Sequence, residues 1–97
     1  MRTLLRVTLD TEAGNRAILD GSLPKIVGQF VEKTKPEAAY FGPHNGKRCA
    51  TFVFDMHDSS QLPALVEPFF VQLGADIDIS PVMNLEDLQK GLAAVER

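Results

Sequence analysis

The stretch 37–56, EAAYFGPHNGKRCATFVFDM, decides the fold. Two strand-like runs, Glu37–Gly42 and Arg48–Met56, flank a short segment rich in turn residues. Within that segment, Asn45 and Gly46 form the strongest short hairpin signal, because both residue types tolerate the positive φ that a type I′ turn needs. We therefore expect an antiparallel hairpin centred on this dipeptide.

The turn fixes which residues of the two runs face one another. Opposite residues share a face of the sheet, and the expected pairs are His44 with Lys47, Gly42 with Cys49, Tyr40 with Thr51, and Ala38 with Val53. The other face is almost entirely apolar, and we expect helices to cover it. Its residues are Ala39, Phe41, Ala50, Phe52, Phe54 and Met56.

Two further segments alternate as strands do. Residues 2–9 place Leu5 and Val7 on one side, and residues 75–82 place Ile77 and Ile79 on one side. These four apolar side chains can join the apolar face of the hairpin under the same helices.

The segment between the first two strand-like runs has apolar residues at helical spacing, which predicts helices there. Asp10 or Thr11 is placed to cap a first turn, after which Ala17 and Ile18 would face the core. The segment 20–24, DGSLP, interrupts that helix. A second helix follows, ended by Pro36, with a core-facing stripe of Leu23, Ile26, Val27, Phe30 and Val31.

The second gap and the C-terminal segment are helical as well. Asp58 and Gln61 have the spacing of a capping box before a helix that ends at Gly74 and is expected to kink at Pro68. Asn84 opens a last helix over Leu85–Glu96. We expect that helix to bury a stripe formed by Leu85, Leu88, Leu92 and Val95.

The element order is β-α-β-β-α-β-α. Two right-handed βαβ crossovers joined by a hairpin predict an α+β domain spanning residues 1–97, with a ferredoxin-like βαββαβ core and an extra C-terminal helix. The sheet would be antiparallel and four-stranded, in the order 4-1-3-2, with its helices on one face.

Composition and charge limit the classes of partner that the chain can bind. The chain has 97 residues and a net charge of −3, so it has no overall positive charge with which to bind phosphates, and we expect no nucleic-acid partner. It shows no signal peptide and no apolar run long enough for a membrane span. Its one cysteine, Cys49, cannot close an internal disulfide or make a zinc site alone, which favours a reducing compartment such as the cytoplasm. We expect no cofactor and no metal.

The face without helices is too apolar for open solvent and too charged for a dry core. Its residues are Leu4, Arg6, Thr8, Ala38, Tyr40, Cys49, Thr51, Val53, Asp55, Asp76 and Asp78. Stacking two copies through this face would enclose a shared cavity.

With this element order, the chain resembles the dimeric α/β-barrel superfamily, in which two ferredoxin-like units pack sheet to sheet. The stretches 40–48, 67–70 and 81–84 look like those of small uncharacterised bacterial members. The resemblance implies a homodimer. It does not imply one chemistry, because the superfamily includes cofactor-free monooxygenases, haem-degrading enzymes, isomerases and binding modules.

Candidate site residues lie on the face without helices. Arg6 is on a central strand, where it could hold a substrate carboxylate or enolate, or instead pair with Asp76 or Asp78. Asp55 and His57 could face the same way and form an acid–base pair, although their spacing matches no metal signature. The expected ligand-binding residues are Arg6, Tyr40, Thr51, Asp55 and Asp78.

Three functions fit these residues. The first is a homodimeric domain that binds a small organic ligand between its sheets. The second is a cofactor-independent monooxygenase or isomerase in which Arg6 stabilises an enolate and Asp55 or His57 moves the proton. The third is a structural or regulatory interaction module.

Overall fold

The predicted strands form one antiparallel sheet in the computed structural model, which describes residues 1–95. The strands are β1 (Arg2–Thr8), β2 (Ala38–His44), β3 (Lys47–Asp55) and β4 (Asp76–Pro81). Their order across the four-stranded sheet is β2-β3-β1-β4, which reads 4-1-3-2 from the other edge. This α+β architecture is compatible with a ferredoxin-like arrangement.

The hairpin between β2 and β3 has the predicted register. His44 pairs with Lys47 and Tyr40 with Thr51. The turn residues Asn45 and Gly46 have φ values of 52° and 78°, the left-handed region that a type I′ turn requires. The Asn-Gly dipeptide therefore sets which side chains of both strands face the helices.

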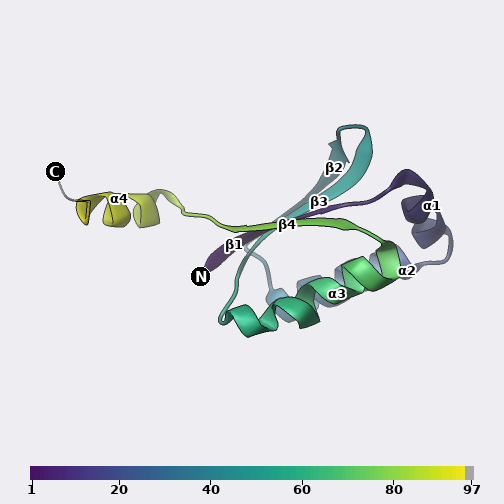
Figure 1. The fold of residues 1–97 in the computed structure, drawn as a ribbon, viewed down its shortest axis with the longest axis horizontal. Helices are drawn as coiled ribbons and strands as arrows, with labels where there is room; N and C mark the ends of the chain where they lie inside the picture. Colours follow the sequence, from purple (N-terminus) through teal and green to yellow (C-terminus); the bar gives the residue numbers. More distant parts are fainter. Residues whose placement is uncertain (96–97) are drawn as a thin grey trace.

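Three helices pack with the sheet: the two longer ones run along one face, and the shortest lies at one end of the sheet (Figure 1). They are α1 (Thr11–Leu19), α2 (Ser22–Thr34) and α3 (Leu62–Leu73). The predicted break between α1 and α2 falls at Gly21, which has a φ of 80°. The predicted capping box of Asp58 and Gln61 is present, and it caps a short 3-10 turn, Ser59–Gln61, that leads into α3. Helix α3 runs through Pro68 to Leu73.

Phenylalanines fill the core between sheet and helices. Phe52 and Phe54, on β3, are at most 1% exposed. Phe30 of α2 contacts both rings, with centroids 4.6 Å and 5.4 Å away, and Phe69 of α3 lies 5.5 Å from Phe30. Edge-to-face contacts of this kind stabilise aromatic clusters beyond the area they bury. The cluster joins the two long helices to the central strands.

Two expectations for the covered face are wrong. Ala17 of α1 is buried as predicted, but Ile18 is 48% exposed, and Gly14 is the other buried position of this helix. Phe41 is on the predicted face, but it is 61% exposed. The Phe41 ring packs edge to face against Phe52 but remains largely exposed, because the helices do not close over the hairpin end of the sheet.

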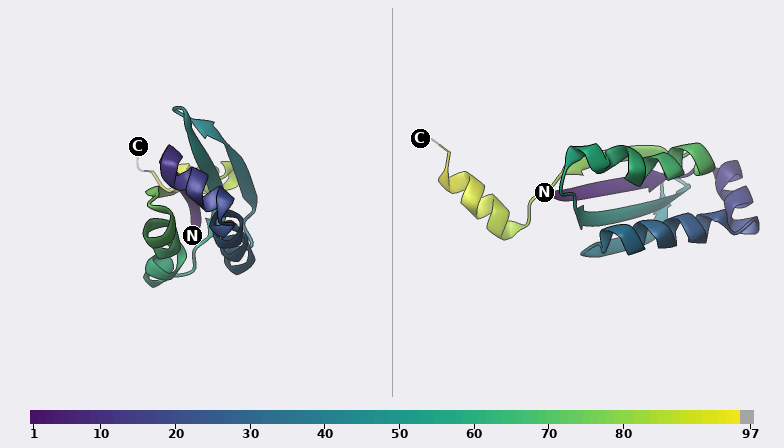
Figure 2. Two further views of the ribbon diagram at one scale, coloured as in Figure 1. Left: turned by 90° about the vertical axis from the view of Figure 1, so that its right-hand side faces the viewer. Right: turned by 90° about the horizontal axis from the view of Figure 1, so that it is seen from below.

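The last helix, α4 (Leu85–Ala93), also differs from the prediction. Asn84 and Asp87 form the capping box, but the apolar stripe is exposed, with Leu85 at 69%, Leu92 at 56% and Val95 at 58%. The chain runs beyond the end of the sheet after β4, so α4 projects from the body and cannot reach the other helices (Figure 1; Figure 2). The final predicted residue of this helix, Glu96, lies outside the described residues.

Candidate functional site

The face without helices has Arg6 near its centre. Arg6 is on β1, opposite Thr51 of β3 on one side and opposite Asp78 of β4 on the other. Tyr40 of β2 follows Thr51 across the sheet. Residues in one such row point to the same side of a sheet, so the register places four of the five predicted ligand-binding residues in one line.

A cavity of about 250 Å³ lies on the β2 side of Arg6. Tyr40, Thr51, His44 and Cys49 line it together with Arg6. Arg6 is partly buried, and within the described part of the chain its guanidinium makes no hydrogen bond or ion pair. A guanidinium in this setting can bind a carboxylate or enolate oxygen through paired, charge-assisted hydrogen bonds.

Asp78 is not part of this cavity. It is exposed on the edge strand β4, and no ion pair joins it to Arg6, although both lie in the described part of the chain. The cavity on the other side of Arg6, toward β2, is bordered by side chains that bear no negative charge. Of the five predicted ligand-binding residues, Arg6, Tyr40 and Thr51 lie together.

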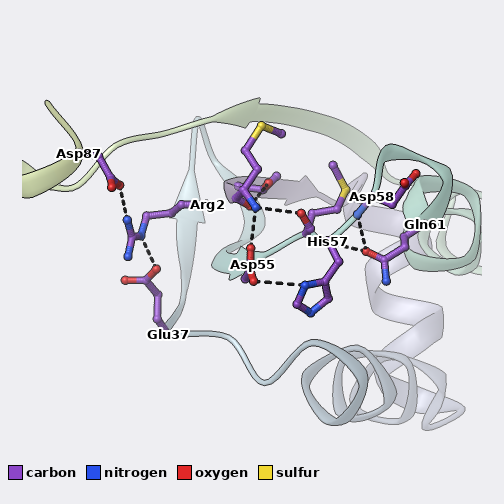
Figure 3. Close-up of polar contacts among 10 residues, drawn as sticks. Arg2, Glu37, Asp55, His57, Asp58, Gln61 and Asp87 are labelled. Atoms are coloured by element: carbon purple, nitrogen blue, oxygen red, sulfur yellow. Dashed lines mark hydrogen bonds and ion pairs between the residues drawn. The ribbon is translucent and has the colours of Figure 1, made fainter. Parts of the chain in front are cut away.

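Asp55 and His57 lie near the opposite end of the strands (Figure 3). One carboxylate oxygen of Asp55 is 2.6 Å from the amino nitrogen of Met1, and the other is 3.4 Å from Nδ1 of His57. The hydrogen bond from the Met1 ammonium group lowers the pKa of Asp55. The two side chains do meet, as their spacing predicted, but both are exposed.

Asp55 is far from Arg6. It stands opposite Arg2 in the register of β1 and β3, and Arg2 and Arg6 are separated by roughly 13 Å of extended strand. The structure therefore splits the predicted site into two groups within one chain: Arg6, Tyr40 and Thr51 near the hairpin, and Asp55 with His57 at the far end.

Arg2 forms an ion-pair cluster that the sequence analysis missed (Figure 3). Its Nε atom is 2.6 Å from Oε1 of Glu37, and its Nη1 atom pairs with Asp87 of α4. The hydrogen bond to Glu37 raises the pKa of Arg2. Because Arg2 has the same strand parity as Arg6, the alternation of the strand could have placed it on this face. Its two partners are too distant in sequence to have been foreseen.

A second cavity, of about 380 Å³, lies on the helix-covered side of the sheet and was also missed. Val7 of β1, Leu9 just after this strand and Phe69 of α3 are its most buried lining residues. Val27 of α2 forms another wall, and Phe41 also lines it. Such a pocket arises because the helices leave the hairpin end of the sheet open. The sequence signal that could have indicated this cavity is the apolar Phe41 next to the small residue Gly42.

The two cavities share a wall. The segment Phe41, Gly42 and Pro43, together with Cys49, lines both of them. The hairpin therefore separates a polar cavity containing Arg6 from an apolar cavity beneath the helices.

Neither a metal centre nor a membrane span emerges from the described residues. Across 1–95, His, Cys, Asp and Glu side chains form no group of three or more suited to a metal ion. None of the helices in that range is both long and apolar enough to cross a membrane.

No protein-family model matches the sequence, and a comparison with curated proteins finds no significant match. Beyond the sheet architecture, the resemblance to the dimeric α/β-barrel superfamily stays a prediction.

Proposed function

We propose that this chain is a homodimeric domain that binds a small acidic organic ligand, with Arg6 as the anchor. The observation that carries the proposal is the Arg6 guanidinium, which is partly buried beside a cavity and has no carboxylate partner among the described residues. Its unpaired side-chain nitrogens remain accessible to solvent, so an anion entering the cavity can reach them. A bound anion would supply the missing partner.

The same face supports dimerisation. Leu4 of β1 and Val53 of β3 are direct neighbours in the sheet and lie on the side without helices. Tyr40 on the same side is 73% exposed. A second copy would cover these apolar side chains, and sheets packed face to face lie about 10 Å apart, close enough to roof the Arg6 cavity. This packing is the dimeric α/β-barrel arrangement that the sequence suggests.

The lining residues define the ligand class. Arg6 supplies the one guanidinium, while Tyr40 and Thr51 supply hydroxyl groups that can donate or accept hydrogen bonds. A cavity of about 250 Å³ in one chain suits a small molecule, even when a second copy adds its own half. We infer a small carboxylic acid or an enolisable compound that carries one negative charge.

An enzymatic role has weaker support. Cofactor-independent oxidation or isomerisation would require a proton-transferring group beside the anion held by Arg6. Asp55 and His57 are 3.4 Å apart, which suits such a pair, but they lie at the other end of the strand from Arg6. The imidazole of His44 does line the cavity, but the predicted pair does not, so we favour binding without chemistry.

A ligand screen tests the proposal. Small carboxylic acids would be screened by ligand-observed NMR against the wild type, Arg6→Met and Arg16→Met. Arg16 is an exposed arginine on α1, outside the Arg6 cavity, so its variant controls for the lost positive charge. We expect hits that bind the wild type and Arg16→Met but not Arg6→Met. Equal binding to all three proteins, or no acid bound by the wild type, would reject Arg6 as the anchor.

A further inference from the structure

Helix α4 carries an apolar stripe that nothing in its own chain covers. Leu85, Leu88 and Leu92 lie on one side of this helix, and they are 69%, 38% and 56% exposed. The helix is well defined at its start by the Asn84–Asp87 capping box. An amphipathic helix with an exposed apolar stripe is typical of a segment that packs against another surface.

The same chain also has an open apolar cavity that could receive such a stripe. The 380 Å³ cavity beneath the helices is lined by Val7, Leu9, Val27 and Phe69, and the 61% exposed Phe41 also borders it. Cavities lined this way favour apolar side chains over water.

These two surfaces cannot meet within one chain. Helix α4 projects from one end of a molecule that is 54 Å long, whereas the hairpin and α1 lie toward the other end (Figure 1; Figure 2). Helix α4 itself has 9 residues, and at 1.5 Å per residue it spans only about 14 Å. A second copy is the partner that can bring an α4 to this cavity.

We propose that α4 of each copy packs over the apolar cavity of the other copy, so that the two chains exchange their last helices. The inference rests on the proposed dimer through the uncovered sheet faces. If the twofold axis lies in the plane between the sheets and across the strands, it reverses the strand direction. The α4 end of one copy then lies beside the hairpin end of the other, and both exchanges form at once.

Charge complementarity supports this pairing. Arg48 borders the cavity, and its only polar partner among the described residues is the neutral Oδ1 atom of Asn15, at 3.0 Å. Glu86 of α4 is exposed, and within 1–95 it forms no ion pair. Docking of α4 would bring this acidic side chain to the basic rim while the leucines enter the cavity.

The exchange makes the partner part of the site. Phe41, Gly42 and Pro43 form the wall between the apolar cavity and the Arg6 cavity. A helix packed against Phe41 would hold that wall in place, so the partner's α4 would complete the pocket in which Arg6 binds its ligand.

Disulfide trapping tests the exchange: Val27→Cys places a thiol in the apolar cavity, in a Cys49→Ser background, because the native Cys49 thiol lies beside the Thr8 hydroxyl on the face of the sheet without helices. Each α4 cysteine variant carries both changes. Leu88→Cys and Leu92→Cys would be made in the full chain and oxidised with diamide, because two positions allow for the exact register. Lys90→Cys is the matched control, since Lys90 lies on the opposite side of α4. Each variant would also be made without Val27→Cys.

We expect a disulfide-linked dimer from at least one leucine variant, several-fold more abundant than from Lys90→Cys, and lost when Val27 is retained. Sedimentation of the unoxidised wild type would accompany the trapping. A wild-type dimer without trapping that depends on Val27→Cys would overturn the helix exchange but leave the dimer intact. A wild-type monomer would overturn both.

Discussion

Arg6 and Asp78 stand directly opposite each other on the neighbouring strands β1 and β4, yet their side chains form no ion pair. Both residues lie in the described part of the chain. Arg6 instead borders the cavity toward β2, while Asp78 is exposed on the edge of the sheet. The ion pair that the sequence suggested between Arg6 and Asp78 is thus not formed. The guanidinium of Arg6 is left available beside the cavity.

This geometry predicts weak coupling between the two residues. In a double-mutant cycle of Arg6→Met and Asp78→Asn, we expect an interaction energy below about 0.5 kcal/mol, because neighbouring opposite charges that form no ion pair and have one exposed partner interact weakly. Thermal and urea unfolding of the four proteins would measure it. A coupling above about 1 kcal/mol would mean that Arg6 is a structural ion-pair partner of Asp78 in solution.

The hairpin turn gives a prediction about stability. Gly46→Val should lower the free energy of unfolding by about 1 kcal/mol or more, because a β-branched residue resists the φ of 78° found there. Gly42→Val is the matched control, since Gly42 is a strand residue that has ordinary φ and open space around it. Urea unfolding would compare the two. Equal effects at both positions would show that the turn is not under this constraint.

The aromatic core gives a second stability prediction. Phe52 is fully buried and its ring lies 4.6 Å from that of Phe30, so Phe52→Ala should cost about 3–5 kcal/mol through lost contacts and a residual cavity. Phe70 on α3 is 44% exposed, and Phe70→Ala should cost about 1 kcal/mol or less. Chemical unfolding would rank the two variants. A similar loss for both would mean that the phenylalanine cluster is not the centre of the core.

The capping box before α3 predicts a pH dependence. The backbone hydrogen bond from Ser60 lowers the pKa of Asp58. A lowered pKa in the folded state means that this carboxylate stabilises the protein at pH values above its ordinary pKa near 4, and that the effect is lost as the pH falls through the folded value.

We therefore expect Asp58→Ala to melt at a lower temperature than the wild type at pH 7, with the difference shrinking toward pH 2. Melting curves followed by circular dichroism across this range would measure it. Ser59→Ala, at the next position, is the control and should show no such trend, because a serine does not titrate. A difference for Asp58→Ala that stays constant with pH would contradict the contribution of the charge.

The sequence predicted the parts of the fold that depend on local rules. The Asn45-Gly46 turn predicted the register of the hairpin, and strand alternation placed Arg6 on the same face as Thr51 and Asp78. The cap at Asn84 was predicted for the same reason, since it needs only Asp87 three positions later. Each of these features involves residues close in sequence or related by a fixed period.

The features that the sequence could not predict depend on the relative positions of whole helices and strands in the folded chain. The stripe of α4 has the same pattern as a buried helix, but it lies beyond the reach of the core in a single chain. The partners of Arg2, Glu37 and Asp87, come from distant segments. The apolar cavity exists only because the helices stop short of the hairpin, which no local pattern of residues encodes.

Sedimentation equilibrium is the most direct test of the proposed dimer through the uncovered sheet face. The wild type at micromolar concentration should have about twice the 10.7 kDa chain mass. Val53→Glu should shift it toward the monomer, because Val53 lies on that face, whereas Val71→Glu, at a 78% exposed position on α3, should not. A wild type that remains at 10.7 kDa under these conditions would contradict the proposed dimer.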